Sequence, residues 1–163
     1  MLLGILSDSH GRADTTRAAV RLLVDHGANL LIHLGDIESD RVIDELIGHN
    51  ARIVFGNCDW NADDLAHYAR HVGVGVDDLA GMIEVGGRRI AFTHGHYSDL
   101  MKRALADNVD YLLHGHTHEV RDERVGRTRI INPGALFRAA RYTAAVLDPA
   151  ADVLQFIEVP RTA

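Results

Sequence analysis

Short apolar runs alternate with amphipathic segments in the first third of the chain. Three of the runs have strand length and are closed by polar residues or glycine: Leu2–Leu6, Leu30–Leu34 and Arg52–Phe55. The first intervening segment predicts a helix capped by Asp14 and ended by Gly27, and the second a helix from Ser39 to Gly48. This β-α-β-α-β order is typical of a parallel sheet with right-handed crossovers.

The remainder of the chain follows a different pattern. Residues 61–71 suggest a short helix, and Met82–Val85 and Arg89–Thr93 flank a Gly86-Gly87 turn, which predicts a hairpin. A helix is expected over Ser98–Ala106. Further strands are expected over Tyr111–His114, Glu119–Val125, Thr128–Ile131, Thr143–Leu147 and Val153–Val159. The second half is therefore expected to be mostly antiparallel, and the whole chain fits an α/β fold of two packed sheets with helices on their outer faces.

Composition narrows the class of protein. With 163 residues, 47% hydrophobic and 25% charged, we expect one globular domain over residues 1–163. A net charge of −6 argues against bulk nucleic-acid binding, although a small anionic substrate fits if metals gather at its site. No apolar segment approaches bilayer length, so no membrane association is expected. Cys58 is the only cysteine, which excludes an internal disulfide and a thiolate zinc cluster and favours a cytoplasmic location.

Polar side chains with metal-binding chemistry recur at the ends of the predicted strands. The residues at or just past such ends are Asp8, Asp36, Asn57, His94 and His116. A single Asp or Asn there is more often a turn former, but five in concert indicate a ligand site at one sheet edge. Histidine supports this interpretation, because five of the eleven lie between His94 and His118.

The spacing of the candidate ligands adds detail. Two pairs are separated by a single residue: Asp8 with His10, and His116 with His118. In extended backbone the members of each pair face the same side. Glycines precede Asp36 and Asn57 and allow close approach. Two carboxylates, four imidazoles and an amide exceed the needs of one tetrahedral ion, which favours two ions sharing a carboxylate.

Five motifs, in order, resemble those of the calcineurin-like metallophosphoesterases, and most closely the small single-domain prokaryotic phosphodiesterase branch. They are Asp8-Ser9-His10, Gly35-Asp36, Gly56-Asn57-Cys58-Asp59, His94-Gly95-His96 and Gly115-His116-Thr117-His118. Ile131-Asn132-Pro133-Gly134 resembles a late turn of that branch. The resemblance implies a four-layer αββα sandwich of two mixed sheets flanked by helices.

The same resemblance implies a dinuclear metal centre. The first ion would be bound by Asp8, His10, Asp36 and His118, and the second by Asp36 as a bridge with Asn57, His94 and His116. Mn²⁺ is the expected ion, with Ni²⁺, Fe²⁺, Zn²⁺, Co²⁺ or Mg²⁺ as alternatives. A metal-bridging hydroxide would attack phosphorus in line, without a covalent intermediate. The implied substrate is a small phosphodiester or nucleotide-like molecule, and self-association is left open.

Several residues around these ligands have alternative roles. Cys58 stands where many superfamily members carry histidine, and a thiol is a poor general acid, so substrates with good leaving groups are expected. His96 is either a second candidate acid or a rim residue. Arg12 either contacts a substrate phosphate or is simply solvated, and the same alternatives hold for Arg138 and Arg141.

Three further residues are expected to support the site: Asp59 by orienting a ligand, and His33 and His114 as buried histidines. Nucleotide pyrophosphatase or phosphomonoesterase activity on the same site remains an alternative. A non-catalytic scaffold, like the eukaryotic retromer subunit that resembles this fold, is the other alternative. Because all seven ligand positions are intact, an enzyme is favoured.

Overall fold

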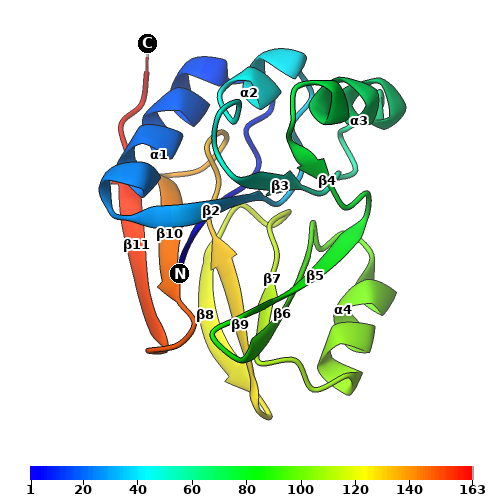
Figure 1. The fold of residues 1–163 in the computed structure, drawn as a ribbon, viewed down its shortest axis with the longest axis vertical. Helices are drawn as coiled ribbons and strands as arrows, with labels where there is room; N and C mark the ends of the chain where they lie inside the picture. Colours follow the sequence, from blue (N-terminus) through cyan, green and yellow to red (C-terminus); the bar gives the residue numbers. More distant parts are fainter. Residues whose placement is uncertain (163) are drawn as a thin grey trace.

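The computed structural model describes residues 1–162, whose strands form two sheets (Figure 1). The first sheet contains β1 (Leu2–Leu6), β2 (Ala28–His33), β3 (Ala51–Ile53), β4 (Gly75–Val76), β10 (Tyr142–Asp148) and β11 (Val153–Val159), in the order β11-β10-β1-β2-β3-β4. The second contains β5 (Ala80–Val85), β6 (Arg88–Thr93), β7 (Tyr111–Leu113), β8 (Val120–Val125) and β9 (Thr128–Pro133), in the order β5-β6-β7-β9-β8. The helices are α1 (Ala13–Asp25), α2 (Asp40–Asp44), α3 (Ala62–His71) and α4 (Ser98–Ala106).

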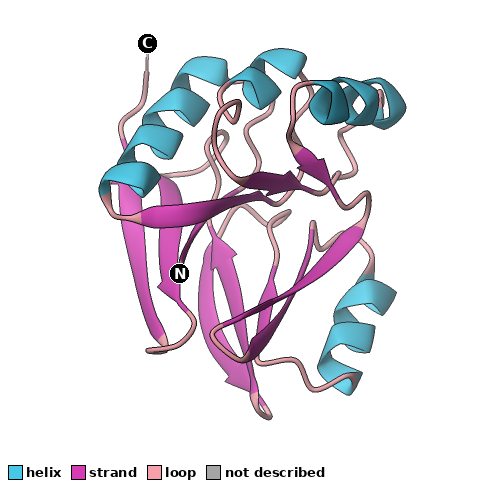
Figure 2. Ribbon diagram, viewed as in Figure 1, coloured by secondary structure: helices cyan, strands magenta, loops and turns pink. Residues whose placement is uncertain are grey.

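Three apolar cores separate four layers. Helices α1, α2 and α3 lie together on one side of the first sheet, and α4 lies beside the second (Figure 2). The core between α1–α3 and the first sheet contains Leu31. The core between the sheets contains Ile32 and Phe92, and that beneath α4 contains Ala104 and Leu112. The predicted four-layer αββα arrangement is confirmed.

The unbroken apolar runs follow from this layering. Leu30 and Ile32 face the core between the sheets, whereas Leu31 faces the core under the helices. Strands buried on both faces need apolar residues at every position, so they show no polar alternation. Gly4 allows β1 to pack closely against Leu31, because a Cβ at this position would lie only 2.7 Å from Leu31 Cδ2.

The second sheet is more parallel than the sequence suggested. Strands β5 and β6 pair antiparallel, as do β8 and β9, and each pair is a hairpin. The central pairings β6–β7 and β7–β9 are parallel. Helix α4 carries the chain back between β6 and β7, and such a crossover connects parallel strands. Strands β10 and β11 join the first sheet as antiparallel partners.

Two helix boundaries differ from the prediction. Asp14 is not the cap of α1; Arg12 holds that position without a side-chain bond, and Asp14 lies in the first turn. A carboxylate there still interacts favourably with the helix dipole. Ser39 does cap α2, but α2 ends at Asp44 because the following turns use i→i−3 bonds, such as Leu46 N–H to Ile43 O at 2.9 Å.

Loops that follow strands of both sheets meet at one end of the molecule. The loops after β1 and β2 are joined by the hydrogen bond from Asp8 N–H to Gly35 O (3.0 Å), and those after β6 and β7 by Gly115 N–H to His94 O (2.9 Å). All of the candidate ligands lie on these loops or on the loop after β3. Within residues 1–162, no helix combines the length and apolarity that crossing a membrane requires.

Candidate metal centre

Two carboxylates and two imidazoles converge where the loops after β1, β2 and β7 meet. Asp8 and Asp36 are 0% and 2% exposed. His118 Nε2 lies 3.2 Å from Asp8 Oδ1, and His10 Nε2 lies 3.6 Å from Asp36 Oδ2. One ligand atom from each of the four residues lies within 4.8 Å of the others. The structure therefore brings together the four residues that the family resemblance implied for one ion.

The imidazole rings are oriented by hydrogen bonds on the opposite ring nitrogen. His10 Nδ1–H donates to Glu38 Oε1 (2.6 Å) and His118 Nδ1–H donates to Arg138 O (3.2 Å). Both Nε2 lone pairs then point inward, with 3.2 Å between them. Ligand nitrogens around a tetrahedral ion with 2.0–2.1 Å bonds are separated by about 3.3 Å. Such an arrangement fits a shared cation and is unfavourable without one.

The hydrogen bonding of the Asp8 carboxylate shows whether the site suits a metal ion. Its Oδ2 accepts hydrogen bonds from Ser7 Oγ (2.6 Å) and from His116 N–H (3.1 Å). Its Oδ1 is buried and has no hydrogen-bond partner among the described residues. A buried carboxylate oxygen without a partner is costly, and a bound cation removes that cost. The residues present therefore fit a divalent ion.

A second group of candidate ligands adjoins Asp36. His94 Nε2 lies 3.3 Å from Asp36 Oδ2 and 3.1 Å from Asn57 Oδ1, and its Nδ1–H donates to Leu34 O (2.7 Å). Asp36 Oδ2 thus lies between His10 and His94. His116 is exposed; its ring centroid is 5.2 Å from that of His94, and no hydrogen bond or ion pair within residues 1–162 joins its side chain to Asp36.

The backbone at these positions is not extended, so the predicted geometry of the two pairs is wrong. Asp8 and His10 have φ of 56° and 44°, and His116 and His118 have φ of 71° and 62°. Asp8 and His10 still reach one site, but His118 contacts Asp8 whereas His116 lies beside His94. Left-handed backbone costs non-glycine residues energy and persists only where surrounding contacts impose it.

Asp59 supplies contacts of this kind to Asp36 and Glu38, whose φ values are 54° and 63°. Its buried carboxylate accepts hydrogen bonds from four backbone N–H groups, those of Asp36 (3.0 Å), Ile37 (2.8 Å), Glu38 (2.7 Å) and Gly56 (2.7 Å). The expectation that Asp59 orients a neighbouring ligand is met through the backbone rather than through a ligand side chain. Asp59 fixes the loop that carries Asp36 and Glu38.

Glycines make room for the centre, as the sequence predicted. A Cβ on Gly56 would lie 2.7 Å from Asp36 N and 2.8 Å from His94 Nε2. A Cβ on Gly35 would lie 2.8 Å from both Gly56 N and His94 Nδ1. Any side chain at either glycine would displace a candidate ligand.

The charges of the group favour a cation. Burial would raise the pKa of Asp8, but the His118 imidazole beside its Oδ1, the charge of His94 and the hydrogen bond from Ser7 outweigh it and lower that pKa. Burial opposes ionisation of Asp36 as well, yet His94 holds its pKa well below the usual range. The two carboxylates, which are almost inaccessible to water themselves, are therefore ionised at neutral pH.

Neither candidate general acid is activated by its surroundings. Burial, followed by the charge of Asp36, raises the pKa of Cys58 to about 11. His96 stacks on Tyr97 at a centroid distance of 4.1 Å, and burial lowers its pKa. The Nδ1 of His96 is buried without a hydrogen-bond partner in the described chain, and its ring lies 5.3 Å from that of His94.

The supporting histidines are buried, as expected. His33 lies 2.5 Å from Ser9 Oγ and accepts a hydrogen bond from Gly35 N–H (3.2 Å). His114 Nδ1 lies 3.0 Å from Gly115 O. The His33 ring therefore joins the loops after β1 and β2, whereas the His114 ring contacts only its own loop after β7 through this bond.

Three residues at the centre were missed by the sequence reasoning: Ser7, Glu38 and Phe137. The Phe137 ring lies 5.9 Å from that of His10, with Arg12 and Arg138 stacked against it. None has a sequence signal, because a serine, a loop glutamate and a lone phenylalanine are ordinary anywhere. Arg12, Arg138 and Arg141 are exposed, and no hydrogen bond joins their side chains to the candidate ligands within residues 1–162.

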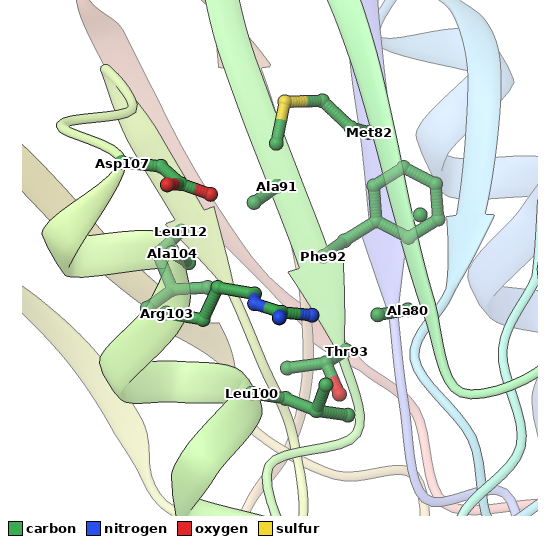
Figure 3. A pocket seen from close by; sticks show the side chains of 11 residues that line it. Ala80, Met82, Ala91, Phe92, Thr93, Leu100, Arg103, Ala104, Asp107 and Leu112 are labelled. Atoms are coloured by element: carbon green, nitrogen blue, oxygen red, sulfur yellow. The ribbon is translucent and has the colours of Figure 1, made fainter.

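A cavity of about 220 Å³ lies elsewhere, between α4 and strands β5 and β6 (Figure 3). Its lining is mainly apolar, including Met82, Phe92 and Leu100, and Arg103 reaches across it from α4. It contains none of the candidate ligands. This cavity is therefore separate from the candidate metal centre.

Comparison with known proteins agrees with this geometry. A sequence model of the calcineurin-like phosphoesterase superfamily domain matches residues 1–152. The chain is 32% identical to phosphodiesterase MJ0936 of Methanocaldococcus jannaschii over 139 residues, which cover 82% of this chain and 83% of that protein. It is 27% identical to phosphodiesterase YfcE of Escherichia coli over 152 residues, covering 83% and 79%. A solved structure of a novel archaeal phosphodiesterase superposes with a TM-score of 0.88 at 27% identity, covering 97% of this chain and 99% of that one. The chain therefore belongs to the calcineurin-like phosphoesterase superfamily.

Proposed function

We propose that this chain is a metal-dependent phosphodiesterase acting on small phosphodiester or nucleotide-like substrates. The observation that carries the proposal is the unpartnered Asp8 Oδ1, faced by His118 Nε2 at 3.2 Å and by His10 Nε2 at 3.9 Å. The relatives named phosphodiesterase support the reaction class. An intact set of oxygen and nitrogen ligands favours catalysis over a scaffold role.

Two ions, most simply Mn²⁺, are proposed for this centre. One would be held by Asp8, His10, Asp36 and His118, and the other by Asp36, Asn57, His94 and His116. Bound divalent ions lower the pKa of water and offset charge on phosphate oxygens during in-line displacement. Mixed carboxylate, amide and imidazole donors suit manganese, and the same ligands would also accept nickel, iron, cobalt, zinc or magnesium.

Other groups of the chain orient the ligands, contact the substrate and determine which leaving groups can depart. Glu38, Leu34 O and Arg138 O hold the Nδ1 protons of His10, His94 and His118 and so fix the ligand tautomers. Arg12 is proposed to contact a substrate phosphate. A Cys58 thiol with a pKa of about 11 cannot protonate a leaving group efficiently at neutral pH. We therefore expect fast cleavage of aryl esters and slow cleavage of alkyl esters.

The experiment compares substrates and metals. Chelated protein is assayed with Mn²⁺, Ni²⁺, Zn²⁺ or Mg²⁺ restored, on bis(p-nitrophenyl) phosphate, p-nitrophenyl phosphate, a nucleotide pyrophosphate and an alkyl monoester. The aryl diester should be cleaved fastest and only when metal is present. Equal rates on the aryl diester and the alkyl monoester would contradict the leaving-group argument.

A matched pair of variants tests the ligand assignment. His116→Ala should abolish turnover and leave the melting temperature of the chelated protein unchanged, since His116 is exposed. His49→Ala removes an equally exposed imidazole beyond α2 and should behave like the parent. Full activity of His116→Ala would refute the assignment.

Three expectations stay predictions: a cytoplasmic location, absence of bulk nucleic-acid binding, and self-association. Cell fractionation, a mobility shift with duplex DNA and sedimentation velocity test them in turn.

A further inference from the structure

Two arginines stack on one aromatic ring beside the candidate metal centre. The guanidinium carbon of Arg12 lies 4.3 Å from the Phe137 ring centroid, and that of Arg138 lies 5.3 Å from it. Arg12 and Arg138 are exposed, and Phe137 is half-buried. We call these three residues the arginine stack. Cation–π contact holds each guanidinium in place at the surface.

The stack carries two positive charges without acidic partners. Within residues 1–162, no carboxylate lies within 4.0 Å of either guanidinium, whereas Arg17 and Arg129 each form ion pairs with acidic side chains. Neither guanidinium donates a hydrogen bond to another group within residues 1–162, so the N–H donors of both are free. Those donors form a fork that matches two oxygens of a phosphate group.

The stack is attached to the metal centre through two ligands. The Phe137 ring is 5.9 Å from the His10 ring, and Arg138 O accepts the hydrogen bond from His118 Nδ1–H. Arg138 has a φ of 51°, so its backbone is held in a strained conformation while it makes this bond. An anion on the stack would therefore lie next to a phosphate on the metals.

Open space adjoins the stack on both sides. A cleft of about 600 Å³ is lined by Arg12, Phe137 and Arg41 together with the acids Asp14, Asp44 and Glu45, and a separate cleft of about 560 Å³ is lined by His118, Arg138 and Glu119 among others. Volumes of this size accommodate a nucleotide-sized group. The chain has a net charge of −6, so a second substrate anion needs local cations of this kind.

We infer that the arginine stack binds a second phosphate group of the substrate. The inference rests on the proposed function, because the scissile phosphate must occupy the metal centre. The substrate class is then narrowed to phosphodiesters that carry an additional phosphate on a nucleoside-sized group. A simple aryl diester lacks that group and uses the metal centre alone.

Binding measurements test the inference without turnover. Isothermal titration of the Mn²⁺-loaded protein compares thymidine 3′,5′-bisphosphate with thymidine 5′-monophosphate. The bisphosphate should bind about tenfold more tightly to the parent protein, the effect of one charge-assisted contact. Arg12→Gln and Arg138→Gln should each reduce this ratio to about two, the statistical advantage of two phosphates. Arg21→Gln removes the same charge further along α1 and should keep the parent ratio.

The outcomes separate this inference from the proposed function. A parent ratio near two, or a tenfold ratio that survives in both stack variants, would overturn the inference. Loss of the ratio in Arg21→Gln as well would also overturn it, because net charge would then explain the preference. Hydrolysis of bis(p-nitrophenyl) phosphate by the parent protein reports the proposed function separately, since that diester carries no second phosphate.

Discussion

Asp59→Asn isolates the contribution of a single buried carboxylate to the metal centre. In the parent protein, Oδ1 accepts from the N–H groups of Ile37 and Glu38, and Oδ2 from those of Asp36 and Gly56. An asparagine amide retains one accepting oxygen, while its NH₂ must face the other two donors in either orientation. Two buried N–H groups then lose their acceptor.

The size of the destabilisation follows from these two N–H groups without an acceptor. A buried donor without a partner costs about 1–3 kcal/mol, so Asp59→Asn should destabilise the chain by roughly 3 kcal/mol, with an upper limit of about 6 kcal/mol. For a chain of this size, that loss lowers the melting temperature by roughly 6–12 °C. The loop that carries Asp36 and Glu38 also loosens, and loss of such a supporting contact weakens metal binding by about 10- to 100-fold.

The assay uses chelated protein for stability and Mn²⁺ titration calorimetry for affinity. Asp63→Asn is the matched control, because Asp63 is an exposed acid in the first turn of α3. It should change stability by less than about 0.5 kcal/mol. If Asp59→Asn is as stable as Asp63→Asn and binds Mn²⁺ like the parent, then the four backbone hydrogen bonds do not support the centre.

Further predictions follow from the same contacts. Gly56→Ala should weaken Mn²⁺ binding by about 100-fold, because its Cβ would meet Asp36 N at 2.7 Å and His94 Nε2 at 2.8 Å. Titration calorimetry measures the affinity. The control Gly126→Ala, at a turn with open space around it, should bind Mn²⁺ like the parent. Burial lowers the pKa of His33 from 6.5 to about 4, so only the unfolded chain binds that proton between these values. The unfolding free energy therefore falls by about 3 kcal/mol from this group as pH falls through this window. Urea unfolding of chelated protein at several pH values should show this decrease. The same decrease in His33→Gln would contradict the assignment. Restoring Mn²⁺ to chelated protein at about 100 times its dissociation constant should add about 2.7 kcal/mol of stability, and an unchanged melting curve would mean that the folded chain binds no Mn²⁺.

The hydrophobic pattern predicted the layers because a strand that is buried on both faces requires an unbroken run of apolar residues. Leu30, Leu31 and Ile32 form an unbroken apolar run, and the structure buries them in two different cores. Pairing direction leaves no such trace. A strand such as β7 is apolar whether its neighbours run parallel or antiparallel, so the parallel centre of the second sheet could not be read from composition.

The candidate ligands were predictable as residue types, but their geometry was not. The two-residue spacing correctly predicted that Asp8 and His10 reach one site. It did so on the assumption of extended backbone, whereas both residues are in fact left-handed. Glu38 and Phe137 act through contacts with His10 from loops remote in sequence. Such partners are set by the tertiary fold, and periodicity carries no information about them.

The most direct test of the dinuclear proposal is anomalous diffraction from a crystal grown with Mn²⁺. We expect two manganese peaks, one contacted by Asp8, His10, Asp36 and His118, and one by Asp36, Asn57, His94 and His116. A single peak, or manganese bound away from Asp36, would contradict the proposal.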